Sequence, residues 1–242
     1  MLQAETPDVE TIAEGGRIYD KWWAEMQLRK PNSTHPAYPS TGKKRGAATW
    51  RCKECHGWDY RGRNGAYSQG SHYSGIKGIR AYAGGDEDKV FAILKDRTHR
   101  YDDVMLDGAL KVVAAFVVHG QVDTSQYIDD NSKLVIGNAQ RGASLFNDNC
   151  ARCHHDDGRA IDFADGDKTE YIGTLANKNP WETLHKIRHG HPGSSMRMHH
   201  RGGMGMMHGR WRPGESMPAM LGELTLAEQI DLLAYTQTLP KD

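Results

Sequence analysis

Apolar and polar positions follow a helical spacing most clearly near the end of this chain of 242 residues. Thr225 and Glu228 have the spacing of a capping box, in which each side chain accepts a hydrogen bond from the other's backbone N–H. Pro240 predicts that the helix ends before this residue, because proline cannot continue a helix. The pattern therefore predicts a terminal helix between Thr225 and Pro240. Its apolar positions recur every three or four residues, at Leu226, Ile230, Leu233 and Ala234.

Shorter stretches predict further helices in both halves of the chain. In the second half they cover residues 139–146 and 179–188, the latter with Pro180 near its start, where proline is tolerated. In the first half they cover residues 15–23, 88–94 and 109–118. The two halves thus repeat one order of elements with variations.

Glycine stands four positions before an aromatic residue at the start of each half. The pairs are Gly15 with Tyr19 and Gly142 with Phe146. A glycine there favours a close crossing of the first and the terminal helix, because a side chain would hold the two backbones apart. We therefore expect one such crossing in each half.

The distance from this aromatic residue to the next cysteine differs between the halves. Tyr19 lies 33 residues before Cys52, whereas Phe146 lies 4 residues before Cys150, so the first half carries an insertion of 29 residues. This insertion either wraps the edge of a bound group or contacts the other domain. We expect an N-terminal domain at residues 1–123, a linker at 124–137 and a C-terminal domain at 138–242.

All four cysteines belong to two C-x-x-C-H runs, which define the candidate chemistry. In such a run the thiols form thioether bonds to the vinyl groups of a haem, and the histidine is an axial ligand of its iron. A zinc site would need a tetrahedral set from both runs or from nearby histidines, and a redox dithiol would need a βαβ pattern. Neither context is visible, so we expect two covalently attached haem c groups. The residues concerned are Cys52, Cys55, His56, Cys150, Cys153 and His154.

Composition is consistent with a haem protein. Hydrophobic residues make up 38% of the chain and the mean hydropathy is −0.72, which is low unless macrocycles supply part of the core. The formal net charge is zero and gives no argument for nucleic-acid binding. No apolar stretch has the length of a membrane span or of a signal-peptide core. Because haem is attached to this motif outside the bacterial cytoplasm, we expect a periplasmic protein whose signal peptide has been removed.

These motifs resemble those of tandem class I dihaem cytochromes c of the bacterial periplasm. The resemblance runs from Gly15 to Pro240 and is carried by residues 49–60 (TWRCKECHGWDY), 76–79 (IKGI) and 233–240 (LAYTQTLP). It implies an all-α fold of two class I cytochrome c domains in tandem, each wrapped around one covalent haem. It also implies an electron carrier between periplasmic redox proteins rather than an enzyme. Such proteins commonly accept electrons from a separate dehydrogenase.

The sixth ligand of each iron sets its chemistry, because a methionine, a histidine or an open position gives different reactivity. In class I cytochromes a methionine shortly before the terminal helix fills this position. For the second haem this favours Met217, then Met220, then Met196. For the first haem it favours Met105 over His99. The axial histidines are expected to donate to backbone carbonyls in the turns at 75–76 and 172–174.

A segment rich in methionine and histidine separates two near-copies of one phrase, HPGSSM at 191–196 and RPGESM at 212–217. This predicts a second insertion at 196–216. Thioether and imidazole ligands suit copper, especially Cu(I). The alternative is a loop over the haem edge in which methionine packs adaptably. The candidate copper ligands are Met198, His199, His200, Met204, Met206, Met207 and His208.

Electron transfer is the leading hypothesis, and a haem enzyme is the alternative. A dihaem thiosulfate dehydrogenase is expected to use a cysteine as one distal ligand, and the chain has no fifth cysteine. A peroxidase-like enzyme needs one haem with an open or displaceable sixth position, which the two candidates at the first haem leave undecided. A third hypothesis is a metal-handling module, which a copper titration would separate from the other two.

Overall fold

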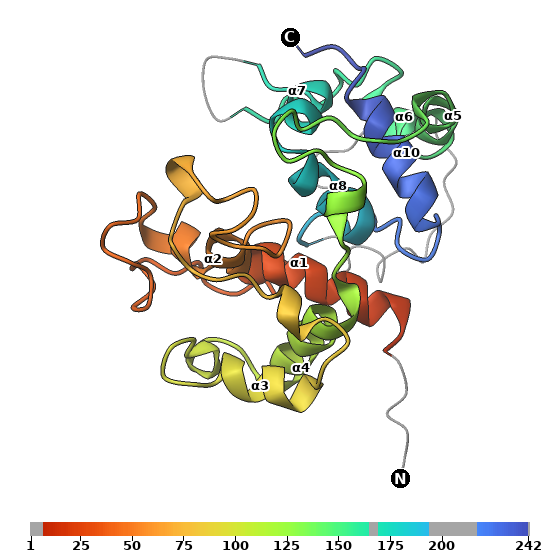
Figure 1. Cartoon of the computed structure of the whole chain (residues 1–242). Coiled ribbons are helices and arrows are strands. Elements are labelled where there is room, and N and C mark those ends of the chain that lie inside the picture. The colour runs from red at the N-terminus through yellow and green to blue at the C-terminus, as the bar shows by residue number, and fades with distance from the viewer. Residues whose placement is uncertain (1–6, 165–168, 194–216, 242) are drawn as a thin grey trace. The chain divides into compact units, whose positions relative to one another are not determined.

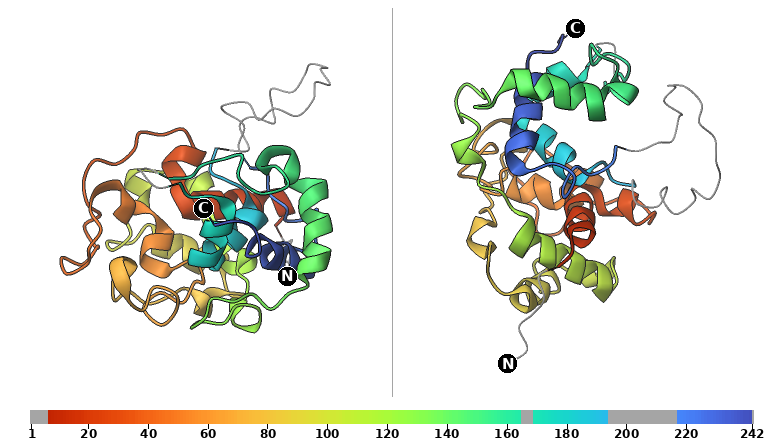
Figure 2. Two further views of the ribbon diagram at one scale, coloured as in Figure 1. Left: turned by 90° about the horizontal axis from the view of Figure 1, so that it is seen from above. Right: turned by 90° about the vertical axis from the view of Figure 1, so that its right-hand side faces the viewer.

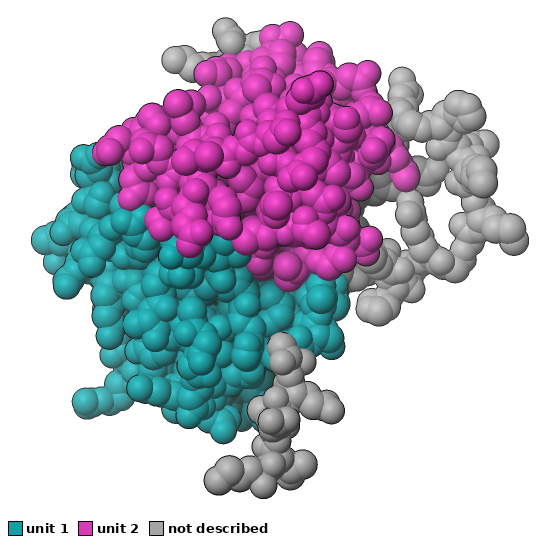
Figure 3. Space-filling view, turned by 45° about the vertical axis from the view of Figure 1, so that its right-hand side comes forward, with its two compact units in different colours: residues 1–123, 191–196 teal, residues 124–190, 197–242 magenta. Residues whose placement is uncertain are grey.

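The computed structural model describes residues 7–164, 169–193 and 217–241, and within these ranges the regular structure is helical, with isolated bridges but no strand (Figure 1). This confirms the expected helical fold. The described residues divide mainly between Asp123 and Thr124 into two compact units, coloured separately in Figure 3. None of their helices is both long enough and apolar enough to cross a membrane.

The first unit is built on α1 (Val9–Glu25), which crosses α4 (Asp107–Ala115) and the π-helical turn η5 (Phe116–Gly120) that continues it. Gly15 of α1 lies at this crossing. A Cβ atom at Gly15 would lie 2.5 Å from the carbonyl oxygen of Val112, far inside ordinary contact. The close approach expected from the sequence is confirmed here.

Short elements connect α1 to α4 and carry the first C-x-x-C-H run. The side chain of Arg51, directly before this run, donates from Nε to the carbonyl oxygen of Asp20 at 2.7 Å and pairs with the Asp20 carboxylate. The run is therefore tied to α1. In chain order the connecting elements are η1 (Gly46–Trp50), α2 (Cys52–His56), η2 (Gly70–His72), η3 (Arg80–Tyr82), α3 (Glu87–Leu94) and η4 (Tyr101–Asp103).

Charged side chains are buried along α1 and are paired there. Arg17 is 2% exposed, and its guanidinium contacts Glu25 at 2.8 Å and Glu10 at 2.7 Å. Glu14 lies on the same helix, and burial together with the nearby charge of Glu25 raises its pKa. Removing one partner from such a buried set leaves an uncompensated charge, which is costly.

The second unit repeats the crossing with α5 (Ala139–Asn149) and α10 (Leu226–Thr236), which cross in Figures 1 and 2. A Cβ atom at Gly142 would overlap the carbonyl oxygen of Asp231, so the close approach is confirmed in this unit as well. The capping box of Thr225 and Glu228 is present at the start of α10.

Three further α-helices of the second unit lie among the described residues. They are α6 (Ala151–His154), α7 (Ile172–Lys178) and α8 (Pro180–His189). α6 carries the second C-x-x-C-H run. α8 begins at a proline, as the sequence predicts, and Asn179 caps it by accepting a hydrogen bond from the Glu182 N–H.

Residues 124–137, expected to form a linker, pack within the second unit and include the single turn η6 (Thr124–Gln126). Ile128 is 1% exposed. The Val135 N–H donates to the side-chain oxygen of Gln237 at 3.0 Å, and the Gln237 amide donates to the carbonyl oxygen of Lys133 at 2.8 Å. Lys133, Val135 and Gln237 all belong to the second unit, so residues 124–137 are part of that unit rather than a linker between two units.

Candidate haem site

α2 presents the histidine of the first C-x-x-C-H run to a cavity. Gly57 ends the helix with a φ of +80°, a value that favours glycine. The Tyr19 hydroxyl donates to the carbonyl oxygen of Gly57 at 2.6 Å and holds this end of α2. Nδ1 of His56 lies 2.8 Å from the carbonyl oxygen of Lys77, immediately after the turn where we expected this acceptor. Nδ1 is thus the donor, and Nε2 is the nitrogen that can bind a metal.

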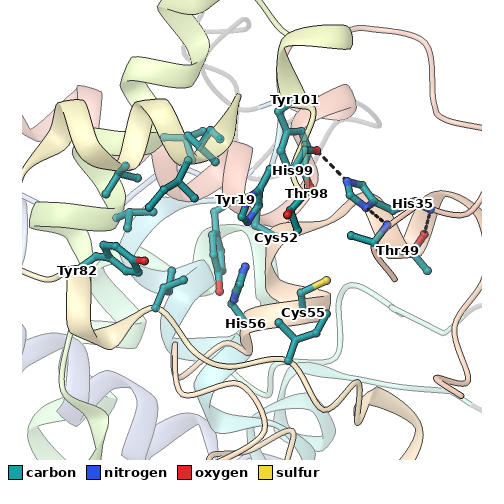
Figure 4. A pocket seen from close by; sticks show the side chains of 18 residues that line it. Tyr19, His35, Thr49, Cys52, Cys55, His56, Tyr82, Thr98, His99 and Tyr101 are labelled. Atoms are coloured by element: carbon teal, nitrogen blue, oxygen red, sulfur yellow. Dashed lines mark hydrogen bonds between the residues drawn. The ribbon is translucent and has the colours of Figure 1, made fainter. Parts of the chain in front are cut away.

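His99 lies opposite His56 across the cavity (Figure 4). The two ring centroids are 6.3 Å apart and the ring planes differ by 23°. Nδ1 of His99 lies 3.1 Å from Oδ1 of Asp96, so Nε2 is again the nitrogen that can bind a metal. The same oxygen of Asp96 accepts the backbone N–H of Thr98 and of His99, both at 2.8 Å. Asp96 therefore fixes the turn and the ring together.

The separation of the two rings matches one metal ion held between them. Imidazole nitrogens bind metals at about 2 Å and lie roughly 1.1 Å from the ring centroid, so two trans imidazoles on one ion have centroids about 6.3 Å apart. Burial lowers the pKa of His56 to about 4, which keeps the ring neutral at pH 7. A neutral imidazole is the form that ligates a metal.

The thiols of the first run border the same cavity, which encloses about 200 Å³. Burial raises the pKa of Cys52 to about 11 and that of Cys55 to about 12, so neither is a thiolate at pH 7. Among the described residues no cluster of three or more potential ligands could hold a zinc ion. Uncharged sulfur suits a thioether instead.

Apolar side chains form most of the remaining cavity wall, and they fit a flat apolar macrocycle with an imidazole on each face. Cys52, Cys55 and His56 all belong to α2 and line this cavity. The apolar residues are Ile76 and Ile79 from the turn before η3, Val90, Ile93 and Leu94 from α3, and Val113 and Val117 from α4 and η5.

The structure places His99, the alternative to Met105 in the sequence analysis, among the side chains that line the cavity with His56. Met105 is 5% exposed, but it is not among the residues that line the cavity. The preference for Met105 rested on distance along the chain to the terminal helix. The turn held by Asp96 instead directs His99 into the cavity, while Met105 packs where the chain enters α4.

The 29-residue insertion of the first unit reaches the same cavity through His35 and Ala37. His35 is 7% exposed. Its Nε2 lies 2.9 Å from the carbonyl oxygen of His99, and its Nδ1 accepts the Ala37 N–H at 3.1 Å. Sequence reasoning missed His35, because the contact joins positions 64 residues apart and no spacing rule connects them.

The second C-x-x-C-H run follows α5 directly, and its histidine is buried. His154 is 7% exposed, and its ring centroid lies 6.4 Å from that of Phe146 and 6.2 Å from that of Phe163. Its Nδ1 has no hydrogen-bond partner among the described residues, so the turn at 172–174 does not supply the expected carbonyl. Burial lowers the pKa of His154 and raises that of Cys150 to about 12. The lowered pKa keeps the His154 imidazole neutral at pH 7, which is the form that ligates a metal.

The methionines expected near the second haem lie just before α10. Met217 is half-buried and Met220 is 9% exposed. The Met220 N–H donates to the carbonyl oxygen of Ile187 at 2.9 Å, which fixes this segment against α8. The third candidate and the possible copper ligands lie outside the described residues: Met196, Met198, His199, His200, Met204, Met206, Met207 and His208.

Comparison with known proteins bears on the second unit. Residues 139–240 match the protein-family model described as Cytochrome c. This stretch is therefore similar to cytochrome c domains. The match spans α5 to α10 with the second C-x-x-C-H run, and it supports a c-type cytochrome with covalent haem c and a role in electron transfer. No curated protein and no solved structure matches the chain.

Proposed function

We propose that the chain is a dihaem c-type cytochrome that passes electrons between periplasmic redox proteins and has no substrate chemistry of its own. The observation that carries this proposal is the facing pair His56 and His99, each held through Nδ1 beside two cysteines in an apolar cavity. The cytochrome c domain at residues 139–240 supports the same role for the second unit.

The first unit would hold its haem through four side chains. Cys52 and Cys55 would form the thioethers, and His56 and His99 would be the two ligands of the iron. When bound, haem supplies a one-electron iron couple. Two imidazoles leave no open position for a substrate, and the apolar walls keep water from the ring. This arrangement favours electron transfer over ligand chemistry and weighs against a peroxidase-like reaction in this unit.

The second unit would hold its haem through Cys150 and Cys153, with His154 and Met217 as axial ligands. Met220 is the alternative to Met217. Methionine opposite histidine raises the reduction potential of a c-type haem above that of a haem with two histidines. Electrons would therefore pass from the haem of the first unit to that of the second, which gives the carrier a direction.

Removing one attachment site at a time tests this proposal in the full-length protein. Two variants suit the purpose, one with Cys52→Ala and Cys55→Ala, the other with Cys150→Ala and Cys153→Ala. Haem content, visible and near-infrared spectra of the oxidised form, and an anaerobic redox titration are measured for each. We expect two haems in the parent and one in each variant.

The two variants should also differ in the spectrum and the reduction potential of the haem that each retains. The haem retained with Cys52 and Cys55 should be low-spin, lack a methionine-to-iron charge-transfer band and have the lower potential. The haem retained with Cys150 and Cys153 should have that band. A single haem in the parent protein would refute the dihaem proposal. A high-spin haem that binds carbon monoxide in the parent would refute the carrier and favour the haem enzyme.

A further inference from the structure

We propose that His35 is a positioning residue for the first haem, which holds the distal ligand in place through that ligand's backbone. The inference rests on the proposed function, in which His99 is the ligand opposite His56. It also explains what the 29-residue insertion contributes, because the insertion supplies a donor that closes the distal side of the cavity.

The hydrogen bonds of the His35 ring fix which nitrogen is protonated. The Ala37 N–H donates to Nδ1 at 3.1 Å, so Nδ1 is the unprotonated nitrogen. Nε2 therefore has the hydrogen and donates it to the carbonyl oxygen of His99 at 2.9 Å. The dashed lines at His35 in Figure 4 mark these contacts.

His99 is thus held at its ring and its backbone N–H by Asp96 and at its carbonyl oxygen by His35. The next residue, Arg100, has a φ of +53°, in the left-handed region that non-glycine residues rarely adopt. A turn with such a conformation at its end needs contacts on both sides to keep one geometry. Without the hydrogen bond from His35, the His99 carbonyl would lose a contact that opposes displacement of this residue from iron.

His35 is itself fixed by packing and by its backbone. Its N–H donates to Oγ1 of Thr49 at 2.8 Å. Its ring meets Trp50 edge-on with centroids 4.4 Å apart and lies 5.8 Å from the ring of Tyr101. The Tyr101 hydroxyl donates to the carbonyl oxygen of Trp50 at 2.9 Å, which closes the cluster. Because these contacts fix the His35 ring, the hydrogen bond from its Nε2 resists displacement of the His99 carbonyl.

The carbon monoxide affinity of the reduced first haem measures how firmly His99 stays on iron, because carbon monoxide binds ferrous haem only where the sixth ligand leaves iron. His35→Phe keeps an aromatic ring against Trp50 and removes the donor. His35→Gln keeps an N–H donor. His119→Phe, on the surface of the same unit beside Glu87, is the matched control. All are compared with the parent as full-length reduced holoprotein, in which the second haem contributes equally.

A hydrogen bond of ordinary strength corresponds to about a fivefold change in an equilibrium. We expect His35→Phe to increase the carbon monoxide affinity of the first haem about fivefold, His35→Gln to stay within about twofold of the parent, and His119→Phe to match it. Equal affinity in His35→Phe and the parent would overturn the inference. So would a rise in His35→Gln as large as in His35→Phe, because that pattern indicates packing alone.

Two further measurements keep the outcome decisive. If His35→Phe does not fold, Thr49→Val removes the acceptor that fixes the His35 backbone, and it should raise the affinity in the same direction. An unchanged affinity there contradicts the inference. The spectrum of the variant with Cys150→Ala and Cys153→Ala, which should retain only the first haem, separates the two proposals. A methionine-to-iron band in that variant refutes the assignment of His99, whereas its absence with an unaffected His35→Phe refutes only the role of His35.

Discussion

Replacing Gly15 by alanine tests the helix crossing on which the first unit depends. The new Cβ atom would lie 2.5 Å from two atoms of the facing segment, the carbonyl oxygen of Val112 and the Cβ of Phe116. Neither can rotate away, because the first belongs to the backbone of α4 and the second is the root of a buried side chain. The two helices would have to separate by roughly 1 Å to restore ordinary contact.

The expected cost follows from two opposing effects. Overpacking at a site that cannot yield costs about 1–3 kcal/mol, and alanine recovers about 1 kcal/mol of helix propensity relative to glycine. Because both contacts are rigid, the upper end of the range applies, and the free energy of unfolding should fall by about 2 kcal/mol. Gly108 is the control: it lies in the first turn of α4, is exposed, and nothing lies within 4 Å of the Cβ that alanine would add. Gly108→Ala should therefore raise the free energy of unfolding by about 0.5–1 kcal/mol.

Urea denaturation of the holoprotein measures both variants. Tryptophan fluorescence follows mainly the first unit, in which Trp22, Trp23, Trp50 and Trp58 are buried, and far-ultraviolet circular dichroism follows both units. With a slope of about 2 kcal/mol per molar urea, the Gly15→Ala midpoint should fall by about 1 M. A midpoint equal to or above that of the parent would refute the close crossing. A fall of the same size in Gly108→Ala would show that propensity and packing had been misjudged in α4.

Three further predictions concern the ligands and a buried carboxyl. His99→Ala should open the first haem, so that its reduced form binds carbon monoxide more tightly than the parent does. The near-isosteric Met105→Leu should keep the parent's visible spectrum, and a changed spectrum in Met105→Leu would contradict the assignment. Asp96→Asn keeps an acceptor for the Thr98 N–H but removes the carboxylate beside Nδ1 of His99. It should raise the potential of the first haem by tens of millivolts in a redox titration, on the scale of about 59 mV for a tenfold change, and a lowered potential would refute the argument. Burial and the charge of Glu25 raise the pKa of Glu14 above its usual value of 4.5. Its ionisation therefore disfavours the folded state increasingly as the pH rises from about 4.5 through the raised pKa. Glu14→Gln should then be more stable than the parent by a few tenths of a kcal/mol at pH 7 and equal to it near pH 4 in urea denaturation, and equal stability at both pH values would contradict this.

The helices could be predicted wherever a chemical signal marks an end or a contact. The capping box at Thr225 places the start of α10 correctly, and the spacing of Gly15 and Gly142 from an aromatic residue identifies both crossings. These signals are local: each depends on residues within one turn or on the absence of a single side chain. Local rules therefore identify α1, α5 and α10, although α1 begins at Val9, before the predicted residue 15.

The distal side of the first site could not be predicted from such rules. His99 and Met105 lie six residues apart, and both are followed shortly by α4, so distance along the chain does not separate them. What separates them is direction, which the three hydrogen bonds accepted by Asp96 determine. The contribution of His35 depends on a contact across 64 residues, which exists only after the insertion has folded over the cavity.

The burial of the two thiols beside His56 has a consequence for the order of events during biogenesis. Cys52 is 8% exposed, and Cys55 also borders the interior cavity. A vinyl group cannot approach these sulfurs from solvent once α1 has crossed α4 and the insertion has covered the distal side. If the first unit holds the proposed haem, its covalent bonds would therefore have to form on an open chain, before tertiary structure. His99 then closes a loop of 43 residues onto a ring already anchored at His56, so that ligation and folding of the first unit become one event.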